Sequence, residues 1–256
     1  MINSEYQEVI KAARLGGQVI KKYFGQNLAV KLKSTIHDFQ TKADLESEKA
    51  VIGHLQKKFP GYNILSEEIG YIDKNSEYTF IIDPLDGSNN FVLNIPIVSV
   101  SIGLMKNDEA VFSAIYDVFL DRVYWAQKGK GAYCDGKKIH VSRQSGLKDS
   151  NIAYNCGYIF SRQEYAKIFK KLQVAEIKRY LTSWSVALDF CLLAAGRIDG
   201  IINNKCEVYD FIAGRLIASE AGAVITDFKG QKDEDKNNRF IASCGKKIHQ
   251  DILKIL

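Results

Sequence analysis

The chain has 256 residues, of which 46% are hydrophobic and 25% are charged, a composition typical of soluble globular proteins. No apolar run approaches the roughly 18 residues of a membrane-spanning helix, and the first residues lack the basic and apolar segments of a secretory signal. The five cysteines are scattered, without a C-x-x-C pair or zinc spacing, so we expect free thiols in a reducing cytoplasm.

The formal net charge of +5 is modest, and the lysines of residues 167–171 and 229–236 lie in expected helices and loops. A solvated surface explains these lysines better than affinity for nucleic acid. A basic surface can still attract anionic small molecules.

Hydrophobic spacing predicts the elements in chain order. The first half begins with helices over residues 4–24 and 43–59 and continues with strands over 62–65, 78–82, 97–105, 110–116 and 122–127 and a hairpin within 129–142. Gly16-Gly17 would weaken the first helix, which indicates close packing against a neighbour.

The second half alternates between the two types of element. Helices are expected over 162–172, 185–195, 210–221 and 246–256, and strands over 177–181, 198–202, 223–225 and 240–242. This order favours an α+β fold. We predict one domain over residues 1–256 with two lobes, roughly 1–145 and 146–256.

The most informative segment runs from Ile81 to Ser88. An apolar strand ends there on Asp83, and Asp86 follows three residues later. Pro84 lacks an N–H group, so we expect the strand ladder to stop and two oxygen ligands to be held at a sharp turn, as Mg²⁺ prefers. Gly87 and Ser88 then open a helix whose N–H groups suit a phosphate.

Further acids stand at the ends of strands and the starts of helices: Glu67, Glu68, Asp210 and Asp44. Each alone has an ordinary explanation as a helix cap or a solvated loop acid. Gathered at one edge of a sheet, where α/β proteins bind ligands, they would repel one another unless cations neutralise them. Two Mg²⁺ ions about 3.5–4 Å apart could then hold the attacking water and the leaving oxygen of a phosphoryl transfer.

Three motifs carry a family resemblance: Glu67-Glu68, the run from Asp83 to Phe91, and the segments from Tyr209 to Gly214 and from Ser219 to Gly222. Together they resemble the inositol monophosphatase family, which belongs to the lithium-sensitive, Mg²⁺-dependent sugar phosphatases. The resemblance implies a layered αβαβα sandwich, usually dimeric. It also implies a phosphomonoesterase that uses two or three Mg²⁺ ions and is inhibited by lithium.

The resemblance also implies residue roles. The metal ligands would be four acids and one backbone carbonyl: Glu67, Asp83, Asp86, Asp210 and Leu85. The N–H groups of Gly87 and Ser88 would hold the phosphate, and Asp86 would contact the substrate as well. A water on the metal would be the nucleophile, oriented and deprotonated with the help of the Ser88 hydroxyl, Asp44 and Glu67.

Three further positions are candidates for substrate binding. Arg179 precedes the expected helix over 185–195, and Trp184 stands where the family commonly has a small Gly. Asn203 stands seven residues before Asp210, where family members that cleave inositol phosphates commonly place a Glu. These differences predict a specificity shifted away from free myo-inositol phosphate, although core packing would also explain Trp184.

The sequence therefore predicts an enzyme that hydrolyses a small sugar or polyol phosphate resembling an inositol phosphate. Fructose 1,6-bisphosphate, histidinol phosphate and 3′-phosphoadenosine 5′-phosphate remain alternative substrates, and a non-enzymatic regulatory role is an alternative function. A haloacid-dehalogenase phosphatase is a rival class, but its two aspartates are two residues apart and the first is a covalent nucleophile. Here Asp83 and Asp86 are three residues apart.

Overall fold

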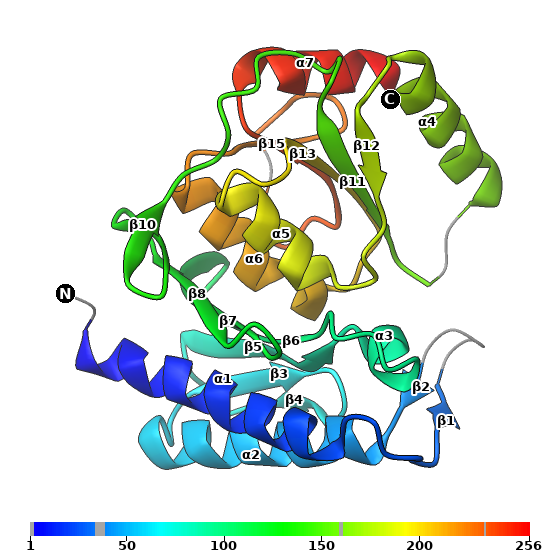
Figure 1. Cartoon of the computed structure of the whole chain (residues 1–256). Coiled ribbons are helices and arrows are strands. Elements are labelled where there is room, and N and C mark those ends of the chain that lie inside the picture. The colour runs from blue at the N-terminus through cyan, green and yellow to red at the C-terminus, as the bar shows by residue number, and fades with distance from the viewer. Residues whose placement is uncertain (1–2, 34–38, 159–160, 233) are drawn as a thin grey trace.

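The structure is a computed structural model that describes residues 3–33, 39–158, 161–232 and 234–256. Its elements form five layers (Figure 1). A helix pair lies below an eight-stranded sheet, a second helix pair lies between that sheet and a five-stranded sheet, and two more helices lie outside the second sheet. The expected αβαβα sandwich is thereby confirmed.

The first half of the chain builds the lower two layers. Helices α1 (Ser4–Tyr23) and α2 (Lys42–Lys58) pack together on one face of the large sheet. The sheet has the order β10-β9-β8-β7-β6-β5-β3-β4, where the strands are β3 (Asn63–Ser66), β4 (Gly70–Ile72), β5 (Tyr78–Asp86), β6 (Ser99–Lys106), β7 (Glu109–Asp117), β8 (Arg122–Gln127), β9 (Gly131–Cys134) and β10 (Lys137–Ile139). The short helix α3 (Ser88–Val92) and the two-strand sheet of β1 (Lys31–Leu32) and β2 (Phe39–Gln40) lie beside one end of it (Figure 1).

The second half builds the other layers. Helices α5 (Val186–Ala194) and α6 (Val208–Glu220) pack between the sheets, and α4 (Arg162–Val174) and α7 (Lys246–Ile255) lie on the outer side (Figure 1). The smaller sheet has the order β12-β11-β13-β15-β14, where the strands are β11 (Asn151–Cys156), β12 (Arg179–Leu181), β13 (Gly200–Asn204), β14 (Val224–Asp227) and β15 (Arg239–Ser243). Because α6 lies between the two sheets and packs against α5, it has eight consecutive buried residues from Phe211 to Ala218.

Two glycines explain how closely α1 approaches its neighbours. A Cβ on Gly16 would lie 2.7 Å from Val51 Cγ2 of α2, and a Cβ on Gly17 would lie 2.3 Å from Tyr116 Cε1 of β7. No larger residue fits at either position without displacing a neighbour. The close packing predicted from Gly16-Gly17 is therefore present.

One expectation about strands was wrong, and one central strand was missed. Strand β5 does not end at Pro84 but resumes at Asp86, which pairs with Ser99, after an irregular register between Asp83 and Asp86. Strand β11 was not predicted at all, although it is a central strand of the smaller sheet and pairs in parallel with β12 and β13.

All five cysteines are free thiols, as the sequence predicts. Across the described part of the chain, no helix combines the length and the apolar character needed to cross a membrane.

Candidate active site

The acids predicted to form a site come together at one edge of the large sheet. Strands β3 and β5 run in parallel, so their carboxyl ends lie at the same edge, with Glu67 directly after β3 and Asp83 and Asp86 in the last residues of β5. The Glu67 N–H donates to the Ile82 carbonyl at 3.2 Å, which places Glu67 beside the start of the turn at Asp83. Glu67, Asp83, Asp86 and Asp210 line a single cavity.

The turn at Pro84 is held by hydrogen bonds from its own residues and from α2. The Leu85 N–H donates to Asp83 Oδ1 at 2.9 Å, and the Ser47 hydroxyl donates to the Pro84 carbonyl at 2.7 Å. These bonds satisfy backbone groups that the interrupted ladder leaves unpaired.

Asp86 is fixed by three donors from two different layers. The Ser99 hydroxyl donates to Asp86 Oδ2 at 2.8 Å, the Ser185 hydroxyl also donates to Oδ2, and the Val186 N–H donates to Oδ1 at 3.0 Å. Residues about one hundred positions apart in the sequence are thereby joined at the acid cluster.

Asp44 and Asp210 each belong to a capping box, as helix-start acids often do. Asp210 Oδ2 accepts from the Glu207 N–H at 2.8 Å. Asp44 Oδ2 accepts from the Thr41 hydroxyl at 2.6 Å, and its other oxygen, Oδ1, accepts from the Ser88 hydroxyl at 3.0 Å. Neither acid is the N-cap itself, which is Thr41 in α2 and Glu207 in α6; both aspartates stand at the third helical position and accept from the N-cap residue. This does not exclude a second role, because each acid keeps a further oxygen.

Burial and mutual repulsion make it unfavourable for these acids to be ionised when no cation is bound. Burial raises the pKa of Glu67 to about 7 against the opposing charge of Lys33, and burial raises the pKa of Asp86 to about 6 against the hydrogen bonds from Ser185 and Ser99. Burial, followed by the charges of neighbouring acids, raises the pKa values of Asp83 and Asp210 well above the ordinary value. A cation in the cavity would remove this cost.

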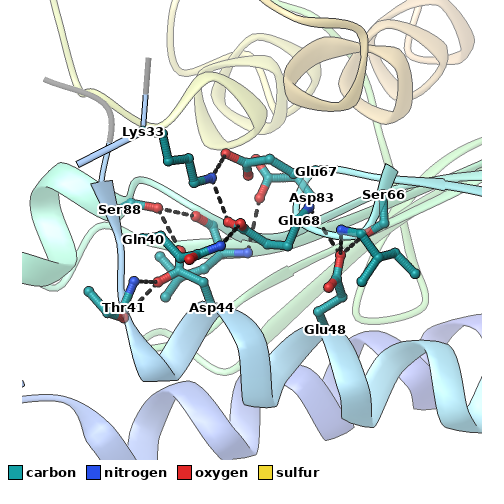
Figure 2. A network of polar contacts seen from close by, with 12 residues as sticks. Lys33, Gln40, Thr41, Asp44, Glu48, Ser66, Glu67, Glu68, Asp83 and Ser88 are labelled. Carbon is teal, nitrogen blue, oxygen red and sulfur yellow. Dashed lines mark hydrogen bonds and ion pairs between the residues drawn. The ribbon is translucent and has the colours of Figure 1, made fainter. Parts of the chain in front are cut away.

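Lys33 supplies one positive charge to the cluster (Figure 2). Its Nζ lies 2.7 Å from Glu67 Oε1 and 2.5 Å from Glu68 Oε1, and Gln40 also donates to Glu68. Burial alone would lower the pKa of Lys33, but the attraction of both glutamates outweighs it and raises the pKa. Within the residues that the structure describes, no three His, Cys, Asp or Glu side chains are grouped around one point as metal ligands.

The donor chemistry nevertheless suits Mg²⁺. The four clustered acids and Leu85 line the cavity, and the Leu85 carbonyl accepts a hydrogen bond from the Ser88 hydroxyl at 3.0 Å. Carboxylate and carbonyl oxygens are the hard donors that Mg²⁺ prefers. Burial makes the negative charge of the carboxylates unfavourable, and a bound cation would compensate for it. The residues therefore fit the metal, provided that the ammonium of Lys33 moves away from Glu67.

The cavity extends from the acids along a largely aromatic wall and has a volume of about 550 Å³. Beyond the acids and the turn, its lining includes Leu93, Tyr154, Asn155, Cys156, Tyr158, Tyr165, Thr182, Trp184, Val186, Cys206, Glu207 and Tyr209. Of the three predicted substrate-binding residues outside the motifs, the structure brings only Trp184 to this cavity.

Arg179 and Asn203 lie elsewhere. Arg179 is exposed at the start of β12, and its guanidinium donates to the Lys178 carbonyl at 2.8 Å. Asn203 is buried in β13, and its amide donates to the Asn238 carbonyl at 3.0 Å. We therefore carry neither residue into the proposals below.

Several residues that support the cluster were missed by the sequence reasoning. Glu48 Oε1 accepts from the Ser66 hydroxyl at 2.5 Å and from the N–H groups of Glu68 and Ile69, which holds the loop that carries Glu67 (Figure 2). Ser99 and Ser185 were missed as well. Only the position of Ser185 at an expected helix start gave a signal.

Comparison with known proteins identifies the family of the chain. The model of the inositol monophosphatase family matches residues 3–256. A fructose-1,6-bisphosphatase/inositol-1-monophosphatase of Aquifex aeolicus is 36% identical, with 87% of this chain and 85% of the relative covered. The Nus factor SuhB of Vibrio cholerae is 34% identical, with 91% and 89% covered.

Solved structures show the same fold. The extragenic suppressor protein suhB of Bartonella henselae superposes with a TM-score of 0.93 at 30% identity, and the alignment covers 99% of this chain and 98% of that one. The rival dehalogenase class is thereby excluded. The chain belongs to the inositol monophosphatase family of phosphoric monoester hydrolases.

Proposed function

We propose that this protein is a Mg²⁺-dependent phosphomonoesterase that transfers the phosphoryl group of a small ester directly to water. The observation that carries the proposal is the convergence of Glu67, Asp83, Asp86 and Asp210 on one cavity. Buried acids with raised pKa values that gather in a cavity beside a helix start are typical of phosphoryl-transfer sites.

The phosphate would lie against the start of α3. Gly87 has φ +93°, and a Cβ there would lie 2.8 Å from the Ile97 carbonyl, so only glycine fits the turn. The N–H groups of Gly87 and Ser88 stand at the first turn of the helix, where N–H groups have no intrahelical acceptor. They can donate to phosphate oxygens, as proposed from the sequence.

Ser88 and Asp44 would handle the proton of the attacking water. The Ser88 hydroxyl lies 3.0 Å from Asp44 Oδ1, and burial raises the pKa of Asp44. The raised pKa makes Asp44 a better proton acceptor near neutral pH. When bound, Mg²⁺ would lower the pKa of water and neutralise charge on the phosphate, and Glu67, Asp83, Leu85, Asp86 and Asp210 would hold it.

A phosphate-release assay in Mg²⁺ tests the proposal, with inositol 1-phosphate, fructose 1,6-bisphosphate, histidinol phosphate and 3′-phosphoadenosine 5′-phosphate as substrates. Asp86→Asn should lower kcat by at least about a hundredfold, because it removes a ligand charge. Asp117→Asn is the matched control, since Asp117 is a buried acid of β7 outside the cavity lining. Full activity of Asp86→Asn, or activity that survives chelation, would contradict the proposal.

The family resemblance further leads us to propose inhibition by lithium and a cytoplasmic homodimer. Inhibition of phosphate release by LiCl, with KCl as the control, and the molar mass measured by light scattering test these two points.

A regulatory role is a second candidate function, because the Vibrio relative is named a Nus factor. Deleting the gene and complementing it with Asp86→Asn or Asp210→Asn separates the two functions. If these variants lose turnover but restore the growth or transcription phenotype, the regulatory role is the one that the cell requires.

A further inference from the structure

Trp184 has a backbone conformation that tryptophan rarely adopts. Its φ is +58°, in the left-handed region where a bulky side chain is strained. Its side chain is also 55% exposed, among the most exposed of the large hydrophobic residues. A strained and exposed tryptophan gains little from packing, so its position calls for another explanation.

The residues on both sides of Trp184 hold its backbone in place. On the N-terminal side, the Asn90 amide of α3 donates to the Ser183 carbonyl at 2.8 Å, and the Ser183 hydroxyl donates to Asp189 Oδ1 at 2.7 Å. On the C-terminal side, the Ser185 hydroxyl and the Val186 N–H donate to Asp86. Asp86 of the acid cluster and Asn90 of α3 thus fix the loop that carries Trp184 at the cavity.

The cavity wall that Trp184 shares is aromatic. Tyr154 and Tyr165 line it with ring centroids 5.1 Å apart, and Tyr158 and Leu93 stand exposed at its edge. Two of the phenol groups already have partners inside the protein: the Tyr154 hydroxyl accepts from Asn204, and the Tyr165 hydroxyl accepts from Tyr180.

Few polar side chains remain on this wall for a ligand. Apart from the four clustered acids and the start of α3, they are Asn155, Thr182, Glu207 and the tyrosines Tyr158 and Tyr209. A ring that carries a hydroxyl on nearly every carbon would place some of these hydroxyls against the aromatic and apolar lining, which costs affinity. A flat apolar ring would instead gain from contact with the aromatic faces.

We propose that Trp184 is a stacking platform for an aromatic or heteroaromatic ring in the alcohol half of the substrate. The substrate class is a phosphate monoester of an alcohol that carries such a ring a few atoms from the phosphate. This inference rests on the proposed phosphatase function and replaces the polyol ester as the preferred substrate.

A matched pair of esters tests the proposal, because 2-phenylethanol and 2-cyclohexylethanol are both primary-alcohol leaving groups; inositol 1-phosphate represents the polyol esters. The enzyme should hydrolyse 2-phenylethyl phosphate with a kcat/KM at least about tenfold above those of 2-cyclohexylethyl phosphate and inositol 1-phosphate. Trp184→Gly should remove this preference by raising KM for the phenyl ester, while Trp184→Phe retains it. Glycine also suits the positive φ, so loss of the preference in Trp184→Gly would not reflect unfolding.

Binding can be measured without turnover. The chain has two tryptophans, so the Trp125→Phe background leaves Trp184 as the only indole. Trp125 stacks on Tyr133, with ring centroids 4.3 Å apart, and phenylalanine keeps an aromatic ring there. Addition of 3-phenylpropylphosphonate should change the Trp184 emission and bind about tenfold more tightly than 3-cyclohexylpropylphosphonate.

The outcomes separate this inference from the proposed function. Preferred hydrolysis of inositol 1-phosphate would overturn the inference and leave the phosphatase function standing. Equal binding of the two phosphonates, or binding unchanged in Trp184→Gly, would also overturn the inference. If no ester is hydrolysed but the phenyl phosphonate binds through Trp184, the inference stands and the phosphatase function fails.

Discussion

At the scale of single residues, the hydroxyl of Ser88 offers the sharpest test of the proposed chemistry. It lies 3.0 Å from both Asp44 Oδ1 and the Leu85 carbonyl, so it connects the proton acceptor with a metal-binding backbone group. Ser88→Ala removes this link and should lower kcat by about a hundredfold. Ser88→Thr keeps the hydroxyl and should remain within a few-fold of the wild-type kcat. An active alanine variant, or activity that appears only with threonine, would contradict this role.

The same residue scale shows what motifs can and cannot predict. Glu67, Asp83, Asp86 and Asp210 were predicted because acids at strand ends and helix starts follow a spacing that can be read in one dimension. Arg179 and Asn203, which lie outside the cavity lining, depended on the orientation of side chains along strands of the smaller sheet. The face of the sheet on which a side chain lies is set by the strand register and by pairing between distant segments, which sequence spacing alone does not reveal.

At the scale of elements, the close contact between α1 and β7 leaves no room for a side chain at Gly17. A Cβ on Gly17 would enter the ring of Tyr116, whose hydroxyl is held by Asp121 at 2.6 Å. Gly17→Ala should therefore destabilise the protein by about 1–2 kcal/mol, despite the better helix propensity of alanine.

The matched control is Gly53→Ala in α2, where a Cβ would meet nothing within 4 Å. This variant should gain up to about 1 kcal/mol, because alanine is the better helix former in open space. Urea denaturation of both variants measures the difference. If the two substitutions change the free energy of unfolding equally, close packing is not the reason for Gly17.

Elements were predicted well where local patterns are strong and poorly where pairing is non-local. Helices α1 and α2 were found within one residue of their bounds, because apolar residues recur at helical spacing. Strand β11 was missed because its sequence, Asn-Ile-Ala-Tyr-Asn-Cys, has polar residues in positions that only pairing with β12 and β13 makes favourable. Tyr154 and Cys156 of the cavity wall were missed with it.

At the scale of the whole molecule, the five layers bring the site together from segments that are remote in sequence. The acids come from the turn after β3, from β5 and from α6, and Ser185 and Val186 at the start of α5 donate to Asp86 from the other half of the chain. The family resemblance predicted this layering, whereas composition and periodicity alone supported only an α+β class. The aromatic side of the cavity follows from the layering and could not be predicted from any single motif.

The burial of the acid cluster also predicts how stability depends on pH. In the metal-free protein, burial raises the pKa of Glu67 from 4.5 to about 7 and that of Asp86 from 3.8 to about 6. The folded state therefore binds more protons than the unfolded state between these values, so the free energy of unfolding falls as the pH rises. This contribution is fully present below about pH 4 and is lost as the pH passes through 6 to 7.

Mg²⁺ should reverse the trend, because it binds the deprotonated carboxylates and stabilises the folded state more as protons leave. We expect urea midpoints in EDTA to be higher at pH 5 than at pH 8, and excess Mg²⁺ to remove or invert the difference. Asp86→Asn should show a smaller pH dependence in EDTA, which separates the cluster from acids elsewhere in the protein. The prediction fails if, in EDTA, the stability rises from pH 5 to pH 8 by the same amount in the wild type and in Asp86→Asn. That result would show that ionisation of the clustered acids does not destabilise the folded state.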